Sequence, residues 1–290
     1  MFACGIAAVA PVKPVKLISW NTNPRRHVQR QARALLSRLP DIVALQEVTA
    51  GSVAAWVQAL RAGGLHHARA TVAESSAARP GPHAYGVLIA GRYPLLDPTS
   101  VAFSVPGWDE KALSVLLDTA IGELAMHTVH VPNGSANGWA KVDVLEAVYA
   151  GVSVRCRERH TVLCGDFNTP QCELPSGEIV TWAQRLDAAG TVRLVRRIRA
   201  RPGERWDTAE RNILSGLEPF GLRDVFRSLH GSGVDACSWV VRHKGLIRRR
   251  RFDHIFASAR LRTITCEYLT GWREDGLSDH AAIEAVVEQQ

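Results

Sequence analysis

Residues 15–47 read VKLISWNTNPRRHVQRQARALLSRLPDIVALQE, and this stretch decides the fold. Residues 15–20 form a short run of strand-favouring residues, residues 28–39 place apolar and charged side chains at helical spacing, and residues 41–46 form a second apolar run. Such an order predicts a strand, a helix and a buried strand. The stretch is therefore predicted to be a βαβ unit, and its second strand delivers the carboxylate of Glu47.

Strands and helices continue to alternate along the rest of the chain. We expect a second helix at about residues 52–61, a turn at residues 120–122 that joins two strands into a hairpin, and a helix within residues 138–157. Residues 175–203 show no clear pattern. Further strands are expected at residues 67–72, 85–90, 112–119, 123–131, 161–164, 237–242, 251–257, 263–268 and 281–287, with a loop at residues 79–83.

The composition is typical of a folded enzyme. The chain has 290 residues, of which 46% are hydrophobic and 22% are charged, so it lacks the signature of disorder. No apolar run approaches the roughly 20 residues that a membrane span requires. The six cysteines form no CxxC pair and no spacing that predicts a zinc site or a disulfide framework. We therefore expect a cytoplasmic monomer with reduced thiols and no membrane span.

Positive charge is concentrated in two groups of mostly arginine residues. The formal net charge is +7 and the isoelectric point is near 9.4. Guanidinium groups bind phosphate oxygens in a planar, bidentate way, and clustered positive charge attracts polyanions. Because the second group runs directly into an expected site strand, a nucleic-acid partner is favoured over a merely solvated surface. The groups are Arg193, Arg196, Arg197, Arg199, Arg201 and Arg205, and then Arg242, Lys244, Arg248, Arg249, Arg250 and Arg251.

Polar side chains follow or precede three of the apolar strands. Glu47 ends one strand, Asp166 follows another after the flexible Gly165, and Asp279-His280 begins the last one. Strand ends meet at the lip of a sheet, where loops and ligand sites gather. Each string alone is also typical of an ordinary surface loop. Together they indicate a site for a hard metal ion and a phosphate.

Magnesium suits this donor set better than calcium or zinc. It keeps several waters and takes one or two protein carboxylates plus phosphate oxygens, which fits sparse acids such as Glu47 and Asp279. Zinc would require more histidine or cysteine. Asp253 lies on an expected strand and, if buried, would fix the tautomer of His280 and raise its basicity.

A site that uses residues near both ends of the chain requires one domain whose halves face each other. Length alone would also allow two domains. We expect residues 1–14 to be a flexible N-terminal extension and residues 15–290 to form a single domain. Layer packing then predicts an α+β fold, a four-layer α/β sandwich in which two mixed β-sheets pack face to face with helices outside.

Seven short motifs resemble, in the same order, those of the endonuclease/exonuclease/phosphatase superfamily. This group contains DNase I, exonuclease III, neutral sphingomyelinases and inositol polyphosphate phosphatases. Residues 209–261 look closest to exonuclease III and the abasic-site endonucleases. The motifs are Ser19-Trp20-Asn21, Leu45-Gln46-Glu47, Gly86-Val87-Leu88-Ile89 with Arg92-Tyr93-Pro94, His130-Val131-Pro132-Asn133, Gly165-Asp166-Phe167-Asn168, Arg251-Phe252-Asp253 and Ser278-Asp279-His280.

The resemblance implies a Mg²⁺-dependent phosphodiesterase in which Mn²⁺ can substitute, acting by in-line attack of water. It implies that Glu47 binds the metal, with Asn21 and Asp279 close to it or to its waters. By the same match Asp166 orients or deprotonates the attacking water, and the identity of the base stays open. The other implied catalytic residues are Asn168, which positions the water, His280 with Asp253 at the scissile phosphate, Asn133 at another phosphate oxygen, and His130.

Three positions depart from the abasic-site enzymes. Those enzymes have tyrosine where His130 stands, aspartate where Asn23 stands and tryptophan where Arg250 stands. A cation in place of an aromatic wall weakens a pocket for a base-free sugar. Strict abasic-site specificity is therefore not expected. The candidate substrate-binding residues are Trp239 and Phe252 as pocket walls, with Arg248 and Arg250 as phosphate contacts.

Three functions follow from these features. The leading interpretation is a nuclease that hydrolyses phosphodiester bonds of nucleic acid, DNA rather than RNA by preference, with repair of abasic sites as one form. The second is a phosphoesterase of a phospholipid or inositol phosphate head group. The third is a non-catalytic nucleic-acid-binding protein on the same scaffold, against which the complete set of mutually repelling acids argues.

Overall fold

Strand β1 (Val15–Asn21) and strand β2 (Ile42–Val48) lie parallel and are connected through helix α1 (Val28–Ser37). The predicted βαβ unit is confirmed. The computed structural model describes residues 13–24, 27–73, 81–155, 159–243 and 245–290. Most of the expected extension at residues 1–14, part of the expected loop at 79–83, and Lys244 lie outside the described residues.

The βαβ unit forms the centre of a six-stranded mixed sheet, the first sheet, in the order β19-β20-β1-β2-β4-β3. The last strand, β20, is antiparallel to β1, so that Ser19 faces Ile283. Residues just before β20 therefore lie beside the end of β1. The other strands of this sheet are β3 (His67–Ala70), β4 (Gly86–Gly91), β19 (Leu261–Leu269) and β20 (Ala282–Gln289).

The second sheet is also mixed and six-stranded, in the order β15-β18-β8-β7-β6-β5. Asp166 at the end of β8 pairs with His130 of the parallel strand β7 and with Asp253 of the antiparallel strand β18. Three predicted site residues, His130, Asp166 and Asp253, thus lie side by side at one end of the second sheet. The strands are β5 (Leu95–Leu96), β6 (Ala112–Thr119), β7 (Gly122–His130), β8 (His160–Asp166), β15 (Leu222–Asp224) and β18 (Asp253–Ser258).

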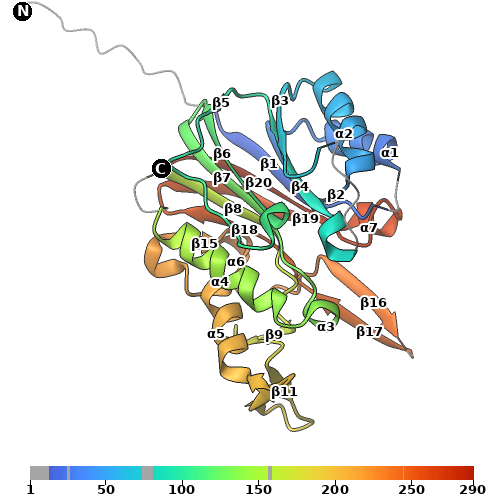
Figure 1. Ribbon diagram of the computed structural model, residues 1–290, viewed down its shortest axis with the longest axis vertical. Helices are drawn as coiled ribbons and strands as arrows, with labels where there is room; N and C mark the ends of the chain where they lie inside the picture. The colour runs from blue at the N-terminus through green and yellow to red at the C-terminus, as the bar shows by residue number, and fades with distance from the viewer. Residues whose placement is uncertain (1–12, 25–26, 74–80, 156–158, 244) are drawn as a thin grey trace, which may run out of the picture.

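The two sheets pack face to face, with helices on both outer sides (Figure 1). Buried side chains such as Leu17 and Ile42 from the first sheet meet Met126 and Val162 from the second in one apolar cluster. Helices α1 and α2 (Ala50–Ala62) cover the first sheet, and α4 (Ala140–Ser153) and α5 (Gly203–Leu214) cover the second. The predicted four-layer α+β sandwich is confirmed.

Elements outside the layers are short. The expected 79–83 loop contains a 3-10 turn, η1 (Gly81–Ala84), and the helix expected within 138–157 is preceded by α3 (Gly134–Asn137). Strands β16 (Trp239–His243) and β17 (Leu246–Arg250) form a ribbon that projects from the sandwich (Figure 1). The remaining elements are η2 (Asp109–Lys111), β9 (Cys172–Glu173), β10 (Ile179–Val180), β11 (Gln184–Leu186), β12 (Val192–Leu194), β13 (Arg197–Ile198), β14 (Arg201–Pro202), η3 (Glu218–Phe220), α6 (Val225–His230) and α7 (Thr270–Glu274).

None of the helices in the described ranges is long and apolar enough to cross a membrane.

Candidate active site

Asn21 joins carboxylates that come from the two sheets. Its Nδ2 donates a hydrogen bond of 2.9 Å to Oδ2 of Asp166 and one of 3.2 Å to Oε1 of Glu47. Asn21 ends β1, Glu47 lies near the end of β2, and Asp166 ends β8 of the facing sheet. Three predicted site residues from distant parts of the sequence therefore meet at one end of the sandwich, between the two sheets.

Glu47 has an unusual backbone conformation for a strand residue. Its φ is +62°, and the pairing of β2 with β4 shifts register between Gln46 and Val48. Left-handed backbone at a non-glycine residue is strained and clusters at functional sites, and a bulge can redirect a side chain. Nε2 of the neighbouring His130 lies 3.6 Å from Oε1 of Glu47.

The loop after β8 places Asp166 and Asn168 side by side. A Cβ at Gly165, whose φ is +138°, would lie 2.0 Å from the carbonyl oxygen of Val129, so only glycine fits there. The backbone N–H of Asn168 donates to Oδ1 of Asp166 at 2.9 Å. The Asn168 side-chain amide donates to the carbonyl of Val131 at 2.8 Å. The loop geometry is thus fixed by glycine and by hydrogen bonds on both sides.

His280 lies between two buried aspartates. Its Nδ1 is 2.7 Å from Oδ2 of Asp253, and its Nε2 is 3.9 Å from Oδ2 of Asp166. The indole N–H of Trp20 donates to the carbonyl of His280, and Ser278 Oγ accepts from the His280 backbone N–H. The structure therefore brings together the His280 and Asp253 pair expected from the sequence, and the free edge of the ring faces Asp166.

Burial and neighbouring charges shift the pKa values of the side chains in this cluster. Burial raises the pKa of Asp166 to about 7, with a further contribution from the Asp253 charge, while His280 opposes the shift. Burial alone would lower the pKa of His280, but the charges of Asp253 and Asp166 raise it to about 10. Burial also raises the pKa of Glu47. For His130, burial lowers the pKa well below its usual value. These shifts favour a neutral His130 and a charged His280 at neutral pH.

The oxygen donors suit a hard divalent cation. Ligand atoms of Asp166, Asp253 and His280 lie within 4.8 Å of one another, but a protonated His280 repels a cation and its Nδ1 is already engaged by Asp253. Glu47, Asp166 and Asp279 offer carboxylate oxygens, the ligands that Mg²⁺ prefers. Oδ1 of Asp279 accepts from Asn23, and its charge contributes to the raised pKa of Glu47.

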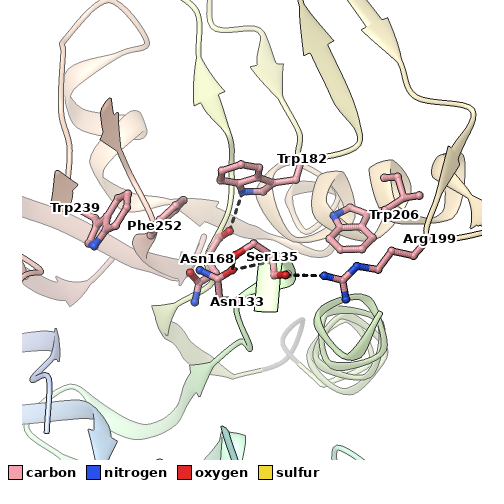
Figure 2. A pocket seen from close by; sticks show the side chains of 10 residues that line it. Asn133, Ser135, Asn168, Trp182, Arg199, Trp206, Trp239 and Phe252 are labelled. Atoms are coloured by element: carbon pink, nitrogen blue, oxygen red, sulfur yellow. Dashed lines mark hydrogen bonds between the residues drawn. The ribbon is translucent and has the colours of Figure 1, made fainter. Parts of the chain in front are cut away.

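A pocket of about 350 Å³ opens beside Asn168 (Figure 2). The rings of Trp239 and Phe252 stack with centroids 5.5 Å apart on one side, and Trp206 lies on the other. The indole N–H of Trp182 donates to the carbonyl of Asn168 at 3.1 Å. The pocket therefore offers aromatic faces next to the polar cluster. It is lined by Asn133, Gly134, Ser135, Asn168, Trp182, Ile198, Arg199, Trp206, Trp239 and Phe252.

Not every predicted residue reaches this pocket. Arg248 is exposed on β17, and the Arg250 guanidinium lies 5.7 Å from the Trp182 ring centroid without lining the pocket. Asn133 does line the pocket, and it also caps the N-terminus of α3. Its Oδ1 accepts hydrogen bonds from the backbone N–H and the hydroxyl of Ser135. Arg248 and Arg250 thus lie around the pocket, whereas Arg199 of the first arginine group lines it.

Sequence reasoning missed two walls of the pocket. Trp182 lies in the stretch without a clear pattern, and Trp206 lies beside the first arginine group. The available signal was a lone tryptophan within a polar segment, which does not reveal its partner. Both tryptophans are held by Glu210, which belongs to no motif.

The chain belongs to the endonuclease/exonuclease/phosphatase family, because the model of that family matches residues 18–280. Proteins of this family are hydrolases that act on phosphodiester or phosphate bonds. A search of curated proteins found no match.

Solved structures share the whole fold at low sequence identity. TDP2 of D. rerio, complexed with single-strand DNA product, is 17% identical with a TM-score of 0.64, covering 95% of this chain and 99% of that one. An AP endonuclease from Archaeoglobus fulgidus is 19% identical with a TM-score of 0.64, covering 93% and 98%. ANGEL2, a 2′,3′-cyclic phosphatase in complex with adenosine-2′,3′-vanadate, is 16% identical with a TM-score of 0.60, covering 94% and 95%. The chain therefore has the fold of DNase I-like enzymes.

Proposed function

We propose that this protein is a divalent-metal-dependent hydrolase of phosphodiester bonds in nucleic acid. The observation that carries the proposal is a cluster of acids joined by Asn21, in which Asp166 accepts a hydrogen bond from Asn168, a residue that also lines a pocket with aromatic walls. The cluster suits a phosphate and a cation, and the pocket suits a planar ring attached to that phosphate.

The side chains take complementary roles in this proposal. Asp166, whose pKa is raised to about 7, accepts a proton from the attacking water, which Asn168 positions. The charged His280, oriented by Asp253, stabilises negative charge on the phosphate oxygens. Mg²⁺ or Mn²⁺, held by Glu47 with Asn21 and Asp279 nearby, would supply further charge neutralisation on the phosphate. Asn133, which lines the pocket, binds another phosphate oxygen, and His130 lies beside Glu47.

Nucleic acid is favoured over an inositol phosphate because of the pocket and the surrounding charge. Aromatic faces bind nucleobases by stacking, whereas a polyol head group needs many polar partners. Exposed arginines on β17, such as Arg248 and Arg249, suit a phosphate backbone. The TDP2 structure, with a DNA product bound to the same fold, supports DNA as the partner.

A phospholipid substrate is the second candidate, and one observation favours it. Leu246 and Ile247 are 61% and 56% exposed at the tip of the arginine-rich ribbon. Apolar side chains flanked by basic ones bind anionic membrane surfaces. Replacing both residues with serine lowers turnover of vesicle-bound phospholipid if this candidate is right. Unchanged turnover of that phospholipid, or no turnover of it by the wild type, contradicts the candidate.

The test of the proposed function is a panel of fluorescent abasic, nicked, single-stranded DNA and RNA substrates with Mg²⁺ or Mn²⁺, alongside vesicles of phosphoinositide or sphingomyelin. We expect cleavage of nucleic acid that EDTA abolishes and that Asp166→Asn lowers about a thousandfold. Hydrolysis of lipid with all nucleic acids intact would refute the proposal. Tight binding that is insensitive to EDTA, with no turnover, would assign the protein to the non-catalytic class.

We further propose that residues 15–290 form one domain of a cytoplasmic monomer. The site draws on both sheets, which supports a single folding unit. The described cysteines Cys164, Cys172, Cys237 and Cys266 are free, which is consistent with reduced thiols. Cys4 and Cys156 lie outside the described residues.

A further inference from the structure

Glu210 of α5 is a fully buried carboxylate that accepts hydrogen bonds from four donors. Its Oε1 accepts from Nζ of Lys141 at 2.5 Å and from the indole N–H of Trp206 at 2.7 Å. Its Oε2 accepts from the hydroxyl of Thr169 at 2.6 Å and from the backbone N–H of Trp182 at 3.0 Å. A buried ion pair adds little net stability compared with apolar packing, but it can fix a geometry.

Two of these four residues, Lys141 and Trp182, also hold the backbone of Asn168. Nζ of Lys141 donates to the Asn168 carbonyl at 2.9 Å, and the indole N–H of Trp182 donates to the same oxygen at 3.1 Å. Asn168 has a φ of +52°, a left-handed conformation that asparagine tolerates better than most other non-glycine residues. The two bonds to its carbonyl hold this conformation in a fixed position beside Asp166.

The same carboxylate also holds two walls of the pocket. Trp182 and Trp206 contact Glu210 directly, and Nζ of Lys141 lies 5.8 and 5.9 Å from their ring centroids. Figure 2 shows Trp182 bonded to Asn168 across the top of the pocket and Trp206 on the opposite side from Phe252. Pocket walls and site loop are thus connected through one buried group.

We propose that Glu210 is a positioning residue that couples the aromatic pocket to Asn168 through Lys141 and Trp182. A planar ring bound between the walls restrains both tryptophans and thereby aligns Asn168 at the neighbouring phosphate. The inference rests on the proposed function, because it gives the pocket a nucleobase and Asn168 a catalytic role. It predicts faster turnover of substrates that place a ring in the pocket.

The test separates positioning from stability with a double variant. Glu210→Gln leaves a buried lysine without its counter-charge, and we expect loss of both stability and kcat. Adding Lys141→Met removes that charge, so the stability lost to it is restored, but the bond from Lys141 to the Asn168 carbonyl is now absent. In the double variant we expect kcat to stay about tenfold or more below wild type on single-stranded DNA and on bis(p-nitrophenyl) phosphate.

Leu60→Ala is the matched control, because Leu60 is buried on α2, on the outer side of the first sheet. It should lose stability while kcat stays within about twofold of wild type. Recovery of kcat together with stability in the double variant would overturn the proposal. So would a loss of kcat in Leu60→Ala as large as that in Glu210→Gln.

Two readouts distinguish this inference from the proposed function. If wild type cleaves bis(p-nitrophenyl) phosphate but no nucleic acid, the proposed substrate is wrong and the comparison of kcat still decides the role of Glu210. Independently of turnover, 5′-deoxyadenylate should quench the fluorescence of the pocket tryptophans, with a Kd about tenfold weaker in the double variant. Absence of quenching in wild type, or an unchanged Kd, would refute the coupling.

Discussion

Single residues set the geometry of the site at the cost of local strain. Glu47 and Asn168 both have positive φ values of +62° and +52°. Each has a buried partner network nearby, through Asn21 for the first and Lys141 for the second. Strain that the surrounding structure maintains is typical of side chains held in a functional orientation. These contacts hold Glu47 and Asn168 in the orientations that the proposed site needs.

Gly165→Ala tests whether the backbone geometry before Asp166 is needed for stability and activity. The new Cβ would lie 2.0 Å from the Val129 carbonyl oxygen, so one of the paired strands must move. We expect a loss of unfolding free energy of about 3 kcal/mol or more and loss of activity, measured by urea denaturation and turnover.

Gly190→Ala is the control for backbone strain alone, since its φ of +81° is also positive but no atom lies within 4 Å of the added Cβ. It should cost about 1 kcal/mol and leave turnover unchanged. Equal losses in the two variants would contradict the proposed steric cause.

Short elements are fastened to the second sheet by buried ion pairs. The guanidinium of Arg251, between β17 and β18, donates to Glu173 on β9 and to Asp224 at the end of β15, the latter at 2.7 Å. Arg227 of α6 also contacts Glu173. Arg251 and Arg227 thus connect β9, the end of β15, α6 and the start of β18 through charged side chains.

This network predicts an acid-sensitive contribution to stability. Burial alone would raise the pKa of Glu173, but Arg251 and Arg227 lower it to about 2. Because the folded pKa lies below the unfolded value, the stabilisation is present at neutral pH and is lost as pH falls from about 5 toward 2. Glu173→Gln should cost about 3 kcal/mol at pH 7 and much less near pH 2.5, by urea denaturation.

The exposed Glu178 on the same hairpin provides the comparison. Glu178→Gln should be near wild type at every pH. A Glu173→Gln deficit that does not change with pH would show that packing, and not charge, is responsible.

For the whole molecule, the sequence predicted the sandwich, the meeting of its site residues and two pocket walls, Trp239 and Phe252, but it did not predict the walls Trp182 and Trp206. Apolar runs at strand spacing make the sheets, and carboxylates at their ends converge by topology. Residues 175–203 form short hairpins whose side chains are largely exposed, so no periodic pattern marks them. The role of Trp182 depends on a contact with Glu210, 28 residues away. The catalytic roles remain a prediction.

A cation at the open end of the two sheets should stabilise the whole molecule. If Mg²⁺ binds the folded state alone, saturation at about 100 times Kd adds about 2.7 kcal/mol to the unfolding free energy. Glu47→Gln should remove most of this gain, whereas Asp118→Asn, an exposed acid on β6, should retain it. Thermal melting with Mg²⁺ and with EDTA measures the difference. A gain of equal size in Glu47→Gln would place the cation elsewhere.

Strand β20 pairs with β1, so a residue from the end of the sequence joins a site that begins near its start. The order of synthesis therefore affects when the site can form. Asn21, Glu47, Asp166 and Asp253 leave the ribosome before His280, which lies directly ahead of β20. A nascent chain can hold Asp166 and Asp253 and still lack His280, the imidazole that lies between them. Translation therefore supplies last the residue that contacts both aspartates, so the cluster can be completed only when nearly all of this sequence has been made.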